Sequence, residues 1–371
     1  MKKIFYVIFL SSVTFLFSCT SQKKKSEVSF IKIKEFEIAV NSRILVSINK
    51  RISQHNSEKT FKIFFQDIKT KKILSFDINK DSLKFVSDTL YNTRNYFCDL
   101  FFYSNDLIYS FHNNINKITL ENNHGENLKT YQISEKYAAV SSPNCKLTGN
   151  NNYLLLANAS RIINVGTLKN RLKYYKQIKP LLLVNIKDSI YSYKAIGDFP
   201  EKYISTGDDY NEFIPSACFG SNNNICVSFS ADNYLYIYNN SNLILKKKVK
   251  SKFIKKFKPY PDDKNFDMLF LKNYIIKEPK YLSVIYDPWQ KLYFRMVKHR
   301  GAISVDKNSS GNSWSVIALD TELNILGEKQ FNYQYNPDVF VPTPFGILMA
   351  RSLISDDSKT VFTLIKIKKN E

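Results

Sequence analysis

The stretch Tyr281–Lys298, YLSVIYDPWQKLYFRMVK, is the part of this 371-residue chain that decides its fold. Two runs of apolar, β-branched and aromatic residues flank the tetrapeptide Asp287-Pro288-Trp289-Gln290. Aspartate suits the first position of a type I turn and proline presets φ at the second, so the stretch predicts a β-hairpin. Strict alternation divides the first strand into two faces, Leu282, Val284 and Tyr286 on one and Tyr281, Ser283 and Ile285 on the other. Because both faces are largely apolar, we expect the hairpin to lie inside a stack of sheets.

The rest of the chain repeats short strand-like runs that are separated by polar turns. The clearest group comprises Phe213–Phe219, Ile225–Phe229, Tyr234–Tyr238 and Leu243–Val249. An earlier group comprises Phe97–Tyr103, Leu107–Phe111, Ile115–Leu120 and Leu128–Ile133. Four strands with tight connections predict one antiparallel sheet. Recurrence of such groups at roughly 45 residues is typical of the blades of a β-propeller.

The sequence therefore predicts an all-β fold, a β-propeller of four-stranded antiparallel blades. Six blades are preferred and seven are the alternative count, while a pair of β-sandwiches is the alternative fold. We expect Phe30–Val40 to complete the last blade beside Val361–Ile367, which closes the ring without an exposed edge. No long amphipathic helix is expected, and Phe266–Leu271 is interpreted as a strand.

The N-terminus has the pattern of a secretory signal. Lys2 and Lys3 precede the uncharged run Ile4–Phe17, which is short for a membrane span. The sequence Leu16-Phe17-Ser18-Cys19 resembles the bacterial lipoprotein processing box. This resemblance implies that Cys19 is diacylated, becomes the mature N-terminus and anchors the protein in a membrane. The alternative is an ordinary cleaved signal followed by an incidental cysteine.

We accordingly divide the chain into a lipoprotein signal peptide at 1–18, the lipidated cysteine and a polar tether at 19–27, and a single β-propeller domain at 28–371. In Bacteroidota lipoproteins, acidic residues directly after the cysteine resemble a surface-export signal. Here the tether holds Lys23-Lys24-Lys25 instead. The expected location is therefore the cell envelope, at the outer membrane facing the periplasm, with the membrane as a partner through the lipidated N-terminus.

Composition indicates a packed globule with a strong positive charge. The hydrophobic fraction of 44% argues against disorder. The net charge is +21, or +19 without Lys2 and Lys3, which would ordinarily suggest nucleic-acid binding. An exported lipoprotein has no obvious nucleic acid to bind, so we expect a solvated basic face or contact with lipid headgroups or acidic glycan. One dense cluster comprises Lys246, Lys247, Lys248, Lys250, Lys252, Lys255, Lys256 and Lys258.

The five cysteines leave four beyond Cys19, namely Cys98, Cys145, Cys218 and Cys226. Cys218 and Cys226 lie on two strands that one turn joins, and the expected compartment permits disulfides. A cross-strand bridge between them is one interpretation. Buried free thiols are the other, because a free cysteine behaves as a small hydrophobic residue.

Sequence motifs for catalysis, metal binding or cofactor binding are not found. The four histidines lack the spacing of paired ligands, so no metal site is expected. Asp306–Gly311 matches the start of a calcium loop, but Ile317 stands where a bidentate glutamate belongs. There is no glycine-rich phosphate loop or dinucleotide fingerprint, so we expect no cofactor. The pairs Asp208-Asp209, Asp262-Asp263 and Asp356-Asp357 are interpreted as turn residues, although a catalytic dyad drawn from different blades stays open.

One constellation is a candidate for binding, the hairpin set Tyr286, Asp287, Trp289, Tyr293 and Arg295. An exposed indole at the turn could stack on a sugar ring, while Asp287 and Arg295 could bind hydroxyls or an acidic ligand. The alternative is structural. In that interpretation Asp287 caps its own turn, the tyrosines pack between blades and Arg295 pairs with a carboxylate.

The last third of the chain carries a family resemblance. YLSVIYDPWQKLYFR, then SVIALDTELNILGEKQF and PTPFGILMARSLISDDSKTVFTLIKI, resemble uncharacterised Bacteroidota lipoproteins with an I-Y-D-x-x-x-x-x-Y-F-R hairpin. Tyr286, Asp287, Tyr293 and Arg295 match that hairpin. The resemblance implies a propeller-like fold and no assigned activity. We expect a membrane-anchored module that binds an envelope protein or glycan without catalysis. The alternatives are a propeller-type lyase or hydrolase acting on an oligosaccharide and an assembly subunit of an envelope machine.

Overall fold

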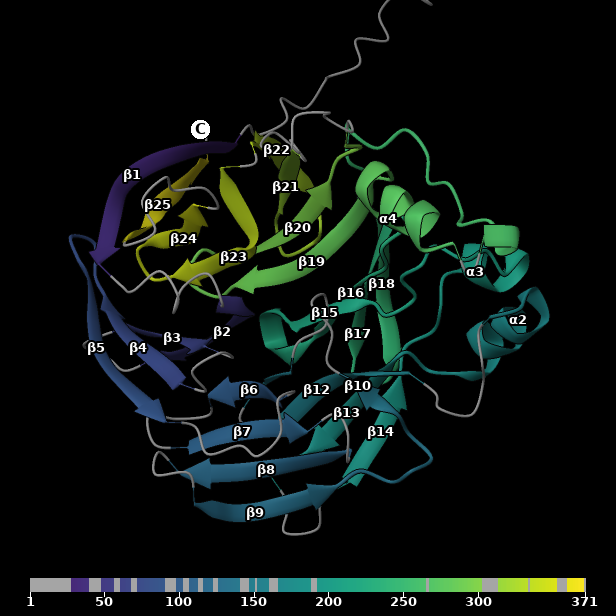
Figure 1. The fold of residues 1–371 in the computed structure, drawn as a ribbon, viewed down its shortest axis with the longest axis horizontal. Helices are drawn as coiled ribbons and strands as arrows, with labels where there is room; N and C mark the ends of the chain where they lie inside the picture. The colour runs from purple at the N-terminus through teal and green to yellow at the C-terminus, as the bar shows by residue number, and fades with distance from the viewer. Residues whose placement is uncertain are drawn as a thin grey trace, which may run out of the picture.

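The computed structural model describes residues 28–39, 48–56, 61–67, 72–90, 98–102, 107–112, 116–122, 126–140, 147–150, 152–159, 166–187, 192–264, 267–301, 313–332, 334–351 and 359–369. Six small antiparallel sheets surround a common axis and form a six-bladed β-propeller (Figure 1). Five of the sheets have four strands and one has five. This architecture confirms the predicted fold class and the preferred blade number.

The blades follow one another along the chain. The first contains β2 (Ile48–Asn56), β3 (Phe61–Asp67), β4 (Lys72–Ile78) and β5 (Leu83–Leu90), and the second contains β6 (Cys98–Phe102), β7 (Leu107–His112), β8 (Lys117–Asn122) and β9 (Asn127–Gln132). The third contains β10 (Ala139–Val140), β11 (Thr148–Gly149), β12 (Tyr153–Asn158), β13 (Leu181–Asn185) and β14 (Ser192–Ile196). The fourth contains β15 (Ser216–Phe219), β16 (Ile225–Ser228), β17 (Tyr234–Asn239) and β18 (Asn242–Lys248). The fifth contains β19 (Lys280–Asp287), β20 (Leu292–Lys298), β21 (Trp314–Leu319) and β22 (Ile325–Phe331).

The sixth blade joins the two ends of the described chain. It contains β23 (Tyr335–Thr343), β24 (Gly346–Arg351) and β25 (Lys359–Lys369), and β1 (Val28–Ala39) is its outermost strand. β1 runs antiparallel to β25 with Phe30 opposite Ile367 and Glu37 opposite Val361. The predicted closure is therefore confirmed. Backbone hydrogen bonds between the first and last strands close the ring.

The opening hairpin forms the two innermost strands of the fifth blade. Tyr286 faces Tyr293 across β19 and β20, as the turn at Asp287 requires. The strict alternation predicted for β19 does not hold, because the register shifts between Tyr281 and Val284. A β-bulge changes which face the following residues occupy. Tyr281 and Val284 consequently pack in the same core cluster.

Among the described residues, three α-helices and two short 3-10 helices interrupt the strands. They are α2 (Leu168–Gln177), α3 (Glu201–Thr206), η2 (Ser221–Asn223), η3 (Asp262–Lys264) and α4 (Met268–Lys277). The interpretation of 266–271 as a strand is wrong where the structure describes this run, because 268–271 form the start of α4. Asp267 is the N-cap of α4, and its side chain accepts a hydrogen bond of 2.8 Å from the backbone N–H of Phe270. A short apolar run fits a strand and a helix equally well, and here the cap decides.

Core packing occurs mainly between neighbouring blades. Phe61 of β3, Leu348 of β24 and Phe362 of β25 share one cluster between the first and sixth blades. Cys226 and Tyr281 share another between the fourth and fifth blades. Burial of apolar side chains between sheets holds adjacent blades together.

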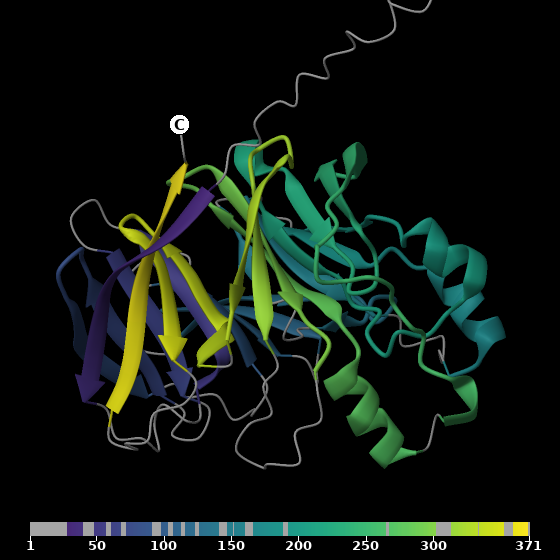
Figure 2. The ribbon, with the colours of Figure 1, turned by 90° about the horizontal axis from the view of Figure 1, so that it is seen from above.

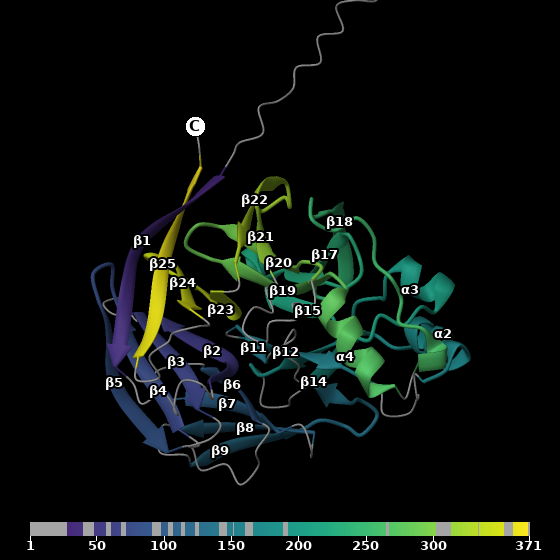
Figure 3. The same ribbon diagram turned by 45° about the horizontal axis from the view of Figure 1, so that its top comes forward.

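The two ends of the ring carry different features. α4 lies in the connection from β18 to β19, at one end of the ring, which we call the α4 face (Figures 2 and 3). β1 begins at the other end, which we call the opposite face (Figure 2). Strand direction explains this arrangement. The outermost strand of a blade ends where the connection to the next blade begins, so it starts at the other end of the ring.

Candidate functional site

The hairpin residues singled out from the sequence contact different blades, and the charged groups of Asp287 and Arg295 are engaged within the fold. The Asp287 side chain is fully buried. Its carboxylate accepts hydrogen bonds from the backbone N–H groups of Trp289, at 2.9 Å, and Gln290, at 3.0 Å, and from the Gln290 side chain. Burial raises the pKa of the Asp287 carboxyl. The carboxylate thus caps its own turn.

Arg295 is also fully buried, at 0% exposure. Its guanidinium donates to the carbonyl oxygens of Asp232, at 2.6 Å, Val249, at 2.8 Å, and Phe229, at 3.4 Å. The Tyr281 ring lies 3.3 Å from the guanidinium carbon. Burial lowers the pKa of Arg295 to about 10. The partners of Arg295 are chiefly backbone carbonyls at the ends of fourth-blade strands.

The three aromatic residues of the set pack against neighbours. The rings of Tyr286 and Tyr293 lie 4.7 Å apart, and the Tyr293 hydroxyl accepts a hydrogen bond of 3.2 Å from the Ser221 backbone N–H. The ring of Trp289 meets Phe61 edge-on at 5.1 Å. These contacts link the fifth blade to the fourth and the first. Ligand binding by this set stays a prediction.

The structure describes Cys218 and Cys226 but not Cys19. Cys218 and Cys226 face each other across β15 and β16, and no disulfide joins them in this structure. A bridge between them stays a prediction. Cys19 lies outside the described residues, so its lipidation stays a prediction as well.

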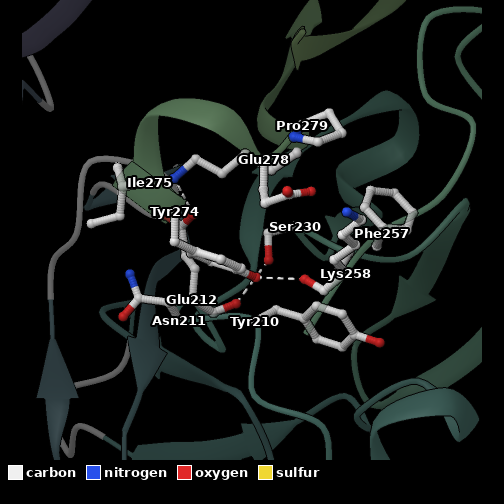
Figure 4. Close-up of a pocket in the computed structure, with 12 residues that line it drawn as sticks. Tyr210, Asn211, Glu212, Ser230, Phe257, Lys258, Tyr274, Ile275, Glu278 and Pro279 are labelled. Atoms are coloured by element: carbon white, nitrogen blue, oxygen red, sulfur yellow. Dashed lines mark hydrogen bonds and ion pairs between the residues drawn. The ribbon is translucent and has the colours of Figure 1, made fainter. Parts of the chain in front are cut away.

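A narrow pocket lies on the α4 face, between α4 and the loops that precede β15 and β19 (Figure 4). Its open volume is about 30 Å³, which has room for water only. Its polar groups bond to one another, since the Tyr274 hydroxyl donates to the Lys258 carbonyl at 2.7 Å and the Ser230 hydroxyl donates to the Glu212 carbonyl at 2.8 Å. Lys280 forms an ion pair with the Glu212 carboxylate. This pocket is therefore a junction between loops, and the polar groups named above already have partners within the protein.

Lys298 fixes the end of α4 beside this junction. Its ammonium donates to the carbonyl oxygens of Ile276, at 3.0 Å, and Glu278, at 3.1 Å, and to that of Ile275. These are the carbonyls that a helix C-terminus leaves without intrahelical partners. Burial, and then the nearby Lys280 charge, lower the pKa of Lys298 to about 8.

A larger, strongly basic pocket adjoins the first and shares part of its wall. Its volume is about 480 Å³, within the range of small-molecule sites. We call it the basic pocket, lined by Phe253, Lys255, Lys256, Lys258, Glu278, Pro279 and Arg300. Glu278 and Arg300 form an ion pair at 3.5 Å. The sequence singled out the three lysines as part of a basic cluster. It gave no signal for Phe253, Glu278 or Arg300, which join them only through folding.

Neither a metal cluster nor a membrane-spanning helix is found in the described part of the chain. Among those residues, no group of three or more His, Cys, Asp or Glu side chains is placed to hold a metal ion. No described helix is long and apolar enough to cross a bilayer.

Residues 28–330 match the model of a protein family, the domain of unknown function DUF4221. The chain belongs to the DUF4221 family. A search of the curated proteins finds no match. The DUF4221 match confirms the resemblance inferred from the hairpin, and it covers five of the six blades.

Solved structures similar to this DUF4221 chain support the fold. A DUF4221 member from Bacteroides vulgatus is 15% identical, with a TM-score of 0.71 over 94% of this chain and 100% of that one. A protein from Bacteroides fragilis is 12% identical, with a TM-score of 0.50 over 93% and 96% of the two chains. At such identities the likeness extends to the fold alone.

Proposed function

We propose that this chain is a membrane-anchored envelope lipoprotein whose β-propeller is a binding module for a ligand or protein partner. A diacylated Cys19 anchors it at the outer membrane, facing the periplasm. The propeller fold and the DUF4221 family support a module of the binding type. The observation that carries the proposal is the basic pocket, which opens on the α4 face between loops of the fourth and fifth blades.

The two ends of the ring suit an anchor on one side and a partner on the other. β1 begins at Val28 on the opposite face (Figure 2). Nine residue steps separate Cys19 from Val28 and span at most about 30 Å when extended. A lipid at Cys19 therefore holds the opposite face towards the membrane. The α4 face then points to the periplasm, where soluble partners can reach it.

Replacement of Cys19 by alanine tests the anchor. We expect the wild-type chain in the membrane fraction of the native cells and Cys19→Ala in the soluble fraction, because the acyl chains provide most of the membrane affinity. Ser21→Ala, in the same tether, is the matched control and stays with the membrane. Retention in the membrane fraction of a Cys19→Ala chain that has lost residues 1–18 would contradict the anchor.

Site-specific photo-crosslinking in the cell envelope tests the binding face. Met268, on the α4 face, is 74% exposed, and Phe85, on an outer strand of the first blade, is 50% exposed. A photoreactive phenylalanine analogue replaces each of them in turn. We expect a discrete adduct from position 268 and none from position 85. Adducts from both positions alike, or from position 85 only, would refute a partner at the α4 face.

A further inference from the structure

The basic pocket concentrates positive charge that the fold does not use. Other lysines of the 246–258 cluster serve the structure. Lys247 donates to the Glu322 carbonyl at 2.8 Å, and the ammonium of Lys246 lies 4.9 Å from the Tyr234 ring centre. In contrast, Lys255, Lys256 and Lys258 are exposed, and none of them forms an ion pair with another described residue.

Like charges gathered around one cavity favour an anion that occupies it. Three lysines and Arg300 line the pocket, and the Arg300 side chain remains 61% exposed beside Glu278. Neighbouring cations repel one another. An anion bound between them offsets that repulsion and accepts charge-assisted hydrogen bonds from them. The pocket therefore selects for negative charge.

Glu278 narrows the chemistry of the ligand further. Its carboxylate is 15% exposed in the same wall and repels a ligand that offers anionic oxygens alone. A ligand that also carries hydroxyl groups can donate hydrogen bonds to Glu278 while its anionic group meets the lysines. Phe253, whose ring stacks on that of His299 at 4.1 Å, adds apolar surface for the C–H groups of a sugar ring. Negative charge, hydroxyls and a ring occur together in an acidic sugar.

We propose that the basic pocket binds an anionic saccharide, a sugar unit that carries a carboxylate or a phosphate. The inference rests on the proposed function, because it names the ligand class of the α4 face. An anionic bilayer fits less well. A membrane surface offers no reason for the concave pocket or for Glu278, and the proposed anchor leaves from the opposite face.

Isothermal titration calorimetry on residues 20–371, which retain every strand of the ring, tests the proposal. The probes are trigalacturonate, mannose 6-phosphate, neutral maltotriose, hexaglutamate and phosphatidylglycerol vesicles. We expect one of the two anionic sugars to bind at least about tenfold tighter than maltotriose, hexaglutamate or the vesicles. The tighter of the two sugars identifies a carboxylated polysaccharide or a phosphorylated glycan headgroup as the source. Equal binding of maltotriose, tighter binding of hexaglutamate or vesicles, or no binding of either anionic sugar would overturn the proposal.

Charge-matched variants locate the site. The triple variant Lys255→Gln/Lys256→Gln/Arg300→Gln should raise the Kd for the better sugar at least about 30-fold. The control, Lys84→Gln/Lys366→Gln/Lys368→Gln, removes the same charge from exposed positions on other strands and should leave the Kd within about twofold. Equal losses in the two variants would show that net charge, rather than this pocket, attracts the sugar.

Glu278→Gln tests the hydroxyl argument separately. We expect this variant to bind tricarballylate, a trianion without hydroxyls, at least about fivefold tighter than wild type does, while trigalacturonate gains nothing. Equal gains for the two probes would overturn the role of Glu278. The proposed function can survive that outcome. If position 268 gave a crosslink but neither anionic sugar bound, the proposal of a partner at the α4 face would hold and the proposal of an anionic saccharide would be wrong.

Discussion

Arg295 holds the ends of several strands of the fourth blade through one buried cation. Its carbonyl partners lie in the loop between β16 and β17 and just after β18, so the guanidinium provides hydrogen bonds that sheet pairing cannot provide there. A guanidinium suits this position, because its N–H groups diverge in one plane towards several acceptors. Arg295 is therefore a structural residue of the blade interface.

Arg295→Met is expected to lower the free energy of unfolding by about 3–5 kcal/mol, because it leaves buried carbonyl groups without donors. Urea unfolding followed by tryptophan fluorescence measures the change. Arg300→Met, at an exposed position, is the control and should stay within about 0.5 kcal/mol of wild type. A loss below about 1 kcal/mol for Arg295→Met would mean that the carbonyls find other donors.

Two blades contain a similar histidine network. In the second blade, His112 lies 3.2 Å from the hydroxyls of Ser110 and Thr119, which both donate to Glu121. In the fifth blade, the His299 ring nitrogens lie 3.0 Å from the Ser313 hydroxyl and 2.9 Å from the Ser315 hydroxyl, and Ser315 donates to Glu328. Burial lowers the pKa of both histidines, although Glu121 and Glu328 act in the other direction.

The protein should therefore lose stability as the pH falls below about 6.5, the ordinary pKa of histidine. Above that pH, both rings are neutral whether the chain is folded or unfolded. Below it, the unfolded chain takes up protons more readily than the folded protein, which shifts the equilibrium towards unfolding. Urea midpoints at pH 7.5 and 5.5 measure the loss. His112→Gln/His299→Gln should reduce the difference between the two midpoints, and an unchanged difference would assign it to other groups.

At the scale of elements, Lys298 links α4 to the fifth blade. None of the residues of α4 is buried, so the helix gains little from core packing. Lys298 instead binds the carbonyls of its last turn and the residue that follows it. This contact positions the wall that the basic pocket shares with the helix end.

Lys298→Met should loosen α4 and leave the ring intact. We expect the amide hydrogens of α4 to exchange at least about tenfold faster, because the last turn loses its donor and opens locally. Hydrogen exchange with mass spectrometry measures the rates, with β20 and β21 as internal references. Lys272→Met, on the exposed side of the same helix, is the matched control. Unchanged exchange in Lys298→Met would show that α4 is held by other contacts.

The elements that sequence predicted well are those whose signals are local. The turn at Asp287 and the alternating runs beside it were sufficient for the hairpin, since the carboxylate caps the turn that its own position favours. α4 was missed because it begins with the apolar run 268–271, which fits a strand as well as a helix, and only the cap at Asp267 distinguishes helix from strand there. The bulge between Tyr281 and Val284 has no local sequence signature either.

The candidate site was only partly predictable for a different reason. The lysine cluster is contiguous in sequence, so its charge was visible. Some of these lysines bond within the fold and others line a pocket. Which lysine does which depends on residues distant in sequence, such as Glu322, which lies 75 residues from its partner Lys247. Glu278 lies just before β19 and Arg300 just after β20, and the hairpin between them brings both to the pocket. Such convergence is a property of the ring.

At the scale of the whole molecule, closure depends on one pair of strands from the two ends of the chain. Five blades form from consecutive strands, but the sixth is complete only when β1 pairs with β25. Until then, β25 and the core beneath Phe36 and Phe362 remain open on one side. The register between β1 and β25 is therefore the contact that makes the fold cooperative around the ring.

A covalent link across that contact should stabilise the protein strongly. Ile31 and Lys366 are exposed and face each other across β1 and β25. Oxidised Ile31→Cys/Lys366→Cys encloses most of the chain in one loop and restricts the unfolded state, so we expect the free energy of unfolding to rise by about 4 kcal/mol. Urea unfolding of the oxidised and reduced forms measures the gain, and the two single variants control for the substitutions. If the oxidised double variant unfolded at the wild-type urea concentration, the link between β1 and β25 would not stabilise the folded ring relative to the unfolded chain.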